Sequence, residues 1–252
     1  MREGFLSNSS RFGRLMTRAG ILIAANLLFL MACMPVVTAG AGLAALHHTM
    51  LRMLRGDGEI NPFREFWHGF KGNLRQATIA FAAIVLLTAF LLLEIFWCTQ
   101  FVGLVAYFRY GLYMILLVEL LLSLYLFPTM AAFDAPLGRL TAHSFFFVMK
   151  RPLTALVVAL IHIVPVLLTV VHVRFLPLYA FVWCMIGAAA IATCCDSMLL
   201  KIFIPYLPQA DVCGEIIPEG MEADFVTEAD QEKKQQRTLE DMMKLGMEEE
   251  KI

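Results

Sequence analysis

Charged residues are scarce in this chain. Only 16% of its 252 residues are Asp, Glu, Lys or Arg, whereas 60% are hydrophobic and the mean hydropathy is +0.72. Soluble domains carry about 25% charged residues, so this composition indicates a chain embedded in a lipid bilayer. The formal net charge is −1, and the sequence shows no basic patch of the kind that binds nucleic acid. We therefore expect a lipid environment and no nucleic acid partner.

Motifs for catalysis and metal binding are also missing. The sequence contains no G-x-S-x-G, no H-E-x-x-H, no phosphate-binding loop and no paired-carboxylate arrangement. Its six cysteines show no C-x-x-C spacing and lie mostly in apolar runs, where cysteine acts as a small core residue. The neighbours His47 and His48 would point about 100° apart on a helix, which is poor geometry for sharing a metal. We therefore expect no enzyme activity, no cofactor and no metal.

What the chain has in abundance is apolar sequence long enough to cross a membrane. Four runs cover approximately residues 77–97, 111–132, 153–173 and 178–200. Each is close to the roughly 20 residues that a transmembrane helix needs. A further run from Thr17 to Pro35 would form a helix about 28 Å long, which is also enough for one crossing.

The apolar sequence is interrupted after that first run, at Pro35, Thr38 and Gly40. Pro35 lacks an amide hydrogen and Gly40 permits unusual dihedral angles, so the segment predicts a helix break. Two interpretations follow. Either the chain turns and residues 41–54 return as a short second helix, or one kinked helix contains the whole stretch.

The distribution of Lys and Arg favours the turn. Of the basic residues between Arg11 and Lys201, a hairpin places twelve on the cytoplasmic side and leaves only Arg109 and Arg174 outside. The cytoplasmic set is Arg11, Arg14, Arg18, Arg52, Arg55, Arg64, Lys71, Arg75, Arg139, Lys150, Arg151 and Lys201. A single kinked helix satisfies the positive-inside rule much less well. We therefore predict an all-α, polytopic transmembrane helix bundle of about six crossings, with both termini cytoplasmic.

A short surface helix is predicted between the hairpin and the next crossing. Asn61 is a good N-cap and Pro62 suits the first helical position. Aromatic residues recur at helical spacing on one face, and Lys71-Gly72-Asn73 predicts the end of the helix. These aromatic residues are Phe63, Phe66, Trp67 and Phe70. Such an amphipathic helix either anchors in lipid headgroups or docks a protein partner.

Polar residues at membrane depth are the candidates for a functional site. Glu119 lies about 12 Å into its span, where an ionised carboxylate is costly and usually faces a partner or water. His162 lies at a comparable depth and is the natural candidate to meet Glu119. Asn26 can hydrogen-bond to another helix, a role that is usually structural. Asp196 is close enough to the end of its span that we expect its side chain to reach water.

The chain divides into two parts by composition. Residues 1–205 form the transmembrane domain. Residues 206–252 are rich in Glu and Asp and begin with a segment that contains Gly214 and Pro218. We expect this second part to be a charged cytoplasmic tail, partly helical or disordered.

Several strings of residues resemble the YesL-like family of bacterial integral membrane proteins. They are Asn26-Leu27-Leu28-Phe29-Leu30, Pro35-Val36-Val37-Thr38-Ala39-Gly40, Leu54-Arg55-Gly56, the run from Phe66 to Thr78, and Tyr125-Leu126-Phe127-Pro128. The resemblance implies a multi-pass protein of the bacterial inner membrane, in a family without assigned catalytic residues. It also implies, by association with carbohydrate importers of the ABC type, an accessory role in oligosaccharide uptake.

Two functions are therefore predicted. The first is an accessory or regulatory membrane subunit that contacts the permease or ATPase subunits of a carbohydrate ABC importer. The alternative is an independent secondary transporter or channel that uses Glu119 at membrane depth, because broken helices often line substrate sites.

Overall fold

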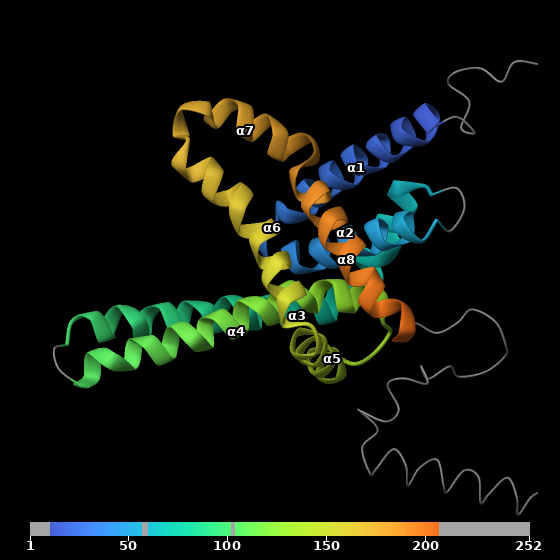
Figure 1. Cartoon of the computed structure of the whole chain (residues 1–252). Coiled ribbons are helices and arrows are strands. Elements are labelled where there is room, and N and C mark those ends of the chain that lie inside the picture. Colours follow the sequence, from blue (N-terminus) through green and yellow to red (C-terminus); the bar gives the residue numbers. More distant parts are fainter. Residues whose placement is uncertain (1–10, 57–59, 102–103, 207–252) are drawn as a thin grey trace, which may run out of the picture. The chain divides into compact units, whose positions relative to one another are not determined.

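The computed structural model describes residues 11–56, 60–101 and 104–206, and these residues form helices and the turns between them (Figure 1). This confirms the all-α prediction. The α-helices are α1 Arg11–Cys33, α2 Ala39–Arg55, α3 Pro62–Thr99, α4 Leu104–Ala132, α5 Leu137–Lys150, α6 Pro152–Val171, α7 Leu176–Val182 and α8 Ala188–Phe203. Short 3-10 helices lie at η1 Val36–Thr38, η2 Val173–Phe175 and η4 Ile204–Tyr206, and a π-helix, η3, covers Trp183–Gly187.

The chain forms two compact units, Met1–Lys201 and Ile202–Ile252. The description below concerns the first unit. Apart from Tyr206, the tail predicted over residues 206–252 lies outside the described residues.

Within the described residues, five helical segments are long and apolar enough to cross a membrane. They are Leu15–Cys33, Pro62–Thr99, Tyr107–Ala132, Pro152–Val171 and Val173–Tyr206. The sixth crossing expected from the sequence corresponds to α2, which is not one of these segments. With 17 residues, α2 is about 25 Å long.

The break predicted between α1 and α2 is present. Helix α1 ends at Cys33, the chain turns through η1, and α2 begins at Ala39. The Thr38 hydroxyl donates to the carbonyl oxygens of Ala32 at 2.7 Å and of Pro35 at 2.9 Å, which stabilises the turn. The two helices run in opposite directions and pack on each other (Figure 1), so the hairpin is correct and the single kinked helix is not.

The prediction of a separate surface helix before the second long span is wrong in one respect. Asn61 does cap the helix, because its side-chain oxygen accepts from the amides of Phe63 and Arg64. However, the helix does not end at Gly72: α3 continues to Thr99 and has 38 residues in all. A helical glycine costs only about 1 kcal/mol relative to alanine, too little to end a helix that tertiary contacts support. Asn73 bonds back within the helix, to the Gly69 carbonyl at 3.2 Å.

The aromatic residues at the start of α3 also do not share one exposed face. Phe66 is only 3% exposed, whereas Phe63 and Trp67 are 62% and 56% exposed. Phe70 is partly buried against the same apolar cluster as Phe66. Phe66 therefore belongs to the core, and the exposed aromatic surface consists of Phe63 and Trp67.

Helix α2 is the most enclosed element of the bundle. It packs against α1, α3 and α4, and 11 of its 17 residues are buried. The core cluster joins α2 to α1, to the start of α3 and to α8. It contains Ile21, Ala25, Ala45, Leu46, Met50, Met53, Phe66, Ala189 and Ala192. The centre of the bundle is thus filled by apolar side chains.

Helices α2 and α3 approach each other closely because of two glycines. A Cβ atom added to Gly40 of α2 would lie 2.5 Å from both the Ala77 carbonyl oxygen and the Phe81 Cβ atom of α3. A Cβ atom added to Gly69 of α3 would lie 2.9 Å from the His48 Cβ atom of α2. Small residues drive helix association in membranes because they let backbones come close. One glycine on each helix, at opposite ends of the contact, fixes this crossing.

We predict that Gly40→Ala lowers the free energy of unfolding by roughly 1–3 kcal/mol, because the new methyl group meets a backbone carbonyl that cannot rotate away. Gly69→Ala should have the same sign. Thermal unfolding of the purified protein in detergent measures both effects.

Gly72→Ala is the matched control on α3, since an added Cβ there meets nothing within 4 Å. This change should leave the stability unchanged or raise it by about 0.5–1 kcal/mol. Equal stability of all three variants would show that the close approach of α2 and α3 is not real.

Candidate functional site

A buried acid–imidazole pair joins α2 to α8. His47 Nδ1 lies 2.8 Å from Asp196 Oδ1, so the imidazole N–H donates to the carboxylate. The two side chains are 6% and 0% exposed. The expectation that Asp196 reaches water is therefore wrong. Its position along the span indicated a shallow depth, but α8 turns this residue toward α2 rather than toward the surface.

Other polar side chains lie near this pair, and together they form what we call the core polar cluster: His47, Tyr125, His162, Cys195 and Asp196. His162 Nδ1 lies 2.9 Å from the Val158 carbonyl oxygen, to which it donates, and 3.6 Å from Cys195 Sγ. His47 is near enough to His162 for their charges to interact, and the same holds for Cys195 and Tyr125. The cluster thus draws on α2, α4, α6 and α8.

Two buried oxygens of the core polar cluster are unsatisfied. Asp196 Oδ2 and the Tyr125 hydroxyl have no hydrogen-bond partner within the described part of the chain. No group of three His, Cys, Asp or Glu among the described residues is placed to hold a metal ion. His47 and Asp196 can share one proton. With that proton bound, the pair has no net charge, which suits an apolar environment.

We predict that Asp196→Ala destabilises the protein by about 3–5 kcal/mol, because it leaves His47 buried without its partner. Asp196→Asn keeps an oxygen acceptor for His47 and should cost less. Cys194→Ala, an exposed neighbour on α8, is the control and should be close to wild type. Unfolding in detergent gives all three values, and an Asp196→Ala protein as stable as the control would contradict the importance of the pair.

Glu119 is held between α4 and α3. Its side chain is buried, at 8% exposed, and Oε1 accepts a hydrogen bond of 3.0 Å from the Thr88 hydroxyl. Oε2 is buried and has no hydrogen-bond partner among the described residues. The partners of His162 are Val158 and Cys195, so the observed hydrogen bonds link Glu119 and His162 to different residues.

Asn26 of α1 holds the π-helix η3 in place. Its amide group donates to the carbonyl oxygens of Trp183 at 3.0 Å and Cys184 at 2.8 Å, and its side-chain oxygen accepts from the Ala189 amide at 3.1 Å. A π-helix interrupts the regular ladder of backbone hydrogen bonds and leaves main-chain groups that need partners. Asn26 supplies these partners from another helix, which explains why a polar residue is fully buried in an apolar run.

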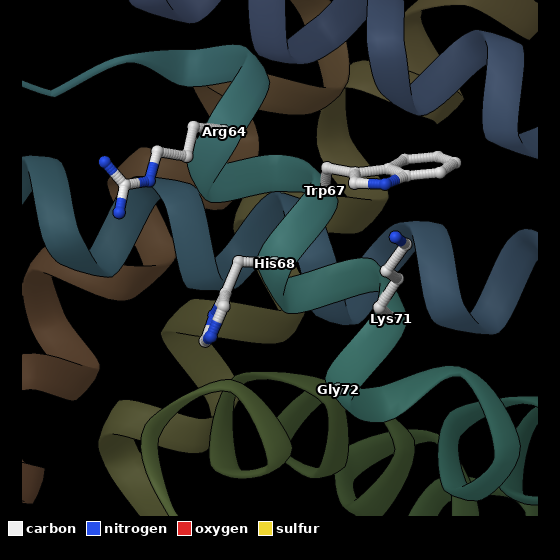
Figure 2. A pocket seen from close by; sticks show the side chains of 5 residues that line it. All are labelled: Arg64, Trp67, His68, Lys71 and Gly72. Carbon is white, nitrogen blue, oxygen red and sulfur yellow. The ribbon is translucent and has the colours of Figure 1, made fainter.

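An open pocket of about 520 Å³ lies at the start of α3 and is lined by Arg64, Trp67, His68, Lys71 and Gly72. Figure 2 shows Arg64 and His68 directed to one side of the helix and Trp67 to the other, with Lys71 beneath the Trp67 indole. The Lys71 ammonium group lies 5.3 Å from the Trp67 ring centroid, a cation–π contact. This pocket therefore combines positive charge with an exposed aromatic ring.

A second pocket, of about 270 Å³, is lined by His48, Leu51, Arg52, Arg55 and Ala131. The rings of His48 and His68 are 5.6 Å apart, so the two pockets are neighbours. Burial lowers the pKa of His48, and its Nδ1 lies 3.4 Å from the Ala131 carbonyl oxygen. His48 therefore faces α3 and α4 while His47 faces α8, as expected for adjacent residues on a helix.

Sequence reasoning singled out Glu119, His162 and Asn26 as candidates, but it did not pair His47 with Asp196. The available signal was the same one that singled out Glu119, an ionisable residue within a long apolar run. The sequence did not indicate how α8 is oriented about its own axis. That orientation decides whether Asp196 contacts solvent or a second helix.

The helices and the buried polar groups together define a polytopic helical protein of the membrane class. Residues 22–95 match the family model described as "Protein of unknown function, DUF624". This segment covers the second half of α1, all of α2, and α3 as far as Ile95. No curated protein and no solved structure matches the chain. The matched segment includes both helices of the close α2–α3 crossing.

Proposed function

We propose that this protein is an accessory or regulatory membrane subunit that works beside a carbohydrate (oligosaccharide) importer of the ABC type, in the inner membrane of a bacterium. Its YesL-like resemblance supports this class of partner, and the positive-inside rule supports cytoplasmic termini. The structural observation that carries the proposal is the exposed aromatic surface at the start of α3.

The filled core supports an accessory role over a transport role. Helix α2 occupies the middle of the bundle, where Leu46, Met50 and Leu51 are fully buried. An oligosaccharide needs a pocket of several hundred Å³ with polar groups. The pockets at the start of α3 and beside His48 lie instead at the polar end of α2 and α3.

The exposed aromatic surface suits a protein partner. Phe63 and Trp67 lie one helical turn apart on α3 and are both more than half exposed. Aromatic residues of this kind dominate binding energy at protein interfaces. Arg64 and Lys71 flank them and suit acidic residues on the partner's cytoplasmic loops. We assign this surface to the importer's permease or ATPase.

Copurification from native membranes tests the proposal. We expect tagged wild-type protein to recover importer subunits, and Phe63→Ser with Trp67→Ser to reduce that recovery at least tenfold, since hot-spot residues contribute 1 kcal/mol or more each. Met149→Ser, an exposed apolar residue on α5, is the control and should leave recovery unchanged. Phe66 is left intact because it belongs to the core.

Recovery of importer subunits at the wild-type level by the double variant would exclude this surface as the docking site. Absence of importer subunits from the wild-type sample would count against the accessory function itself.

Glu119 supports a second candidate, an independent secondary transporter or channel. Its carboxylate is buried between α3 and α4 with one oxygen unsatisfied, and such residues commonly mark ion or proton pathways. Thr88 supplies only one of the contacts that a buried carboxylate requires.

For this candidate we expect Glu119→Gln to abolish pH-dependent uptake in proteoliposomes, because glutamine keeps the shape and the bond to Thr88 but cannot carry a proton. Thr88→Val, which removes the bond and keeps the carboxylate, should reduce uptake only in part. Uptake that is unchanged in Glu119→Gln would remove the chief residue of the transporter hypothesis.

A further inference from the structure

The outward face of α3 changes from basic to apolar within one turn. Arg64, His68, Lys71 and Arg75 follow one another at spacings of three or four residues and are all exposed. The same face continues with exposed apolar residues, beginning at Ile79, at 51%. Because α3 is one uninterrupted helix, the basic segment and the apolar segment form a continuous strip along its surface. This is the order of chemistry that a phospholipid presents, headgroup first and acyl chains next.

The positive charge of this strip is not neutralised within the described residues. Arg64, Lys71 and Arg75 form no ion pair there. The nearest acidic residue in sequence, Glu65, points to the other side of α3, where Arg52 donates to its carboxylate at 2.7 Å. The pocket lined by Arg64, His68 and Lys71 is therefore electropositive (Figure 2).

The size of the pocket is compatible with a headgroup. Its volume of about 520 Å³ lies within the range of small-ligand sites. A guanidinium group binds two phosphate oxygens at once, and an ammonium group adds a point charge. The Trp67 ring holds Lys71 at the pocket through the cation–π contact, and an indole is favoured at the boundary between headgroups and hydrocarbon.

We propose that this pocket is a binding site for an acidic phospholipid, with Arg64 and Lys71 on either side of the phosphate group and the acyl chains running along Ile79 and Leu86. The apolar continuation of the strip selects a lipid over free phosphate, since Leu86 is 70% exposed on the same face. The site shares Arg64, Trp67 and Lys71 with the proposed docking surface. Its test measures lipid binding to the purified protein without an importer, so the two proposals can fail separately.

Titration of the detergent-purified protein with short-chain phosphatidylglycerol, followed by native mass spectrometry, tests the site. Short-chain phosphatidylcholine and inorganic phosphate are the comparison ligands. We expect phosphatidylglycerol to bind preferentially, and Arg64→Gln with Lys71→Gln to weaken its binding about tenfold, which corresponds to about 1.4 kcal/mol.

The matched control is Arg139→Gln with Arg151→Gln, which removes the same charge from two exposed residues, one in α5 and one directly after it. This pair should change the affinity less than about twofold, and Lys71→Arg alone should retain binding. Thermal unfolding checks that every variant is folded.

Three results would overturn the proposal. They are equal binding of phosphatidylcholine, equal weakening by the control pair, and binding of inorganic phosphate as tight as that of phosphatidylglycerol. The last result would identify a soluble anion as the ligand.

Discussion

The close contact between α2 and α3 is the constraint on which the rest of the bundle depends. Apolar surface gains little from burial in a protein that is already surrounded by lipid, so close packing and hydrogen bonds must hold the helices together. Gly40 and Gly69 allow that packing at the two ends of the crossing. Between α2 and the start of α3, Arg52 and Glu65 add a charged hydrogen bond. With this register fixed, His48 faces α3 and α4, whereas His47, about 100° further round the helix, faces α8.

The far side of the bundle is held by polar groups instead of glycines. His47 and Asp196 connect α2 to α8, and Asn26 connects α1 to η3 and the start of α8. Each bond joins segments that are about 150 residues apart in the chain. In an apolar medium an unpaired partner is costly, so such bonds specify one arrangement of helices over others. The first two helices and the last one are therefore positioned by a few directional contacts.

Local signals in the sequence predicted much of this fold. Pro35 and Gly40 identified the hairpin, Asn61 and Pro62 identified the start of α3, and hydropathy identified the long spans. The errors arose where distant contacts override local preference. Gly72 ends an isolated helix but not one supported by α2 and α4. Phe66 and Trp67 are equivalent by periodicity, yet only the contact with α2 and α8 decides which is buried. The sequence indicated how deep Asp196 lies along its span, but not which way its side chain points.

The continuity of α3 has a mechanical consequence. Its 38 residues extend about 57 Å, nearly twice the hydrocarbon thickness of about 30 Å. A helix without a π-bulge or a proline beyond its first turn resists bending, so the two ends of α3 move together. A small tilt at the Arg64 end, where α3 packs against α2, displaces the opposite end near Thr99 by a larger distance. Any tilt of α3 that began on one side of the bilayer would therefore also displace the end on the other side.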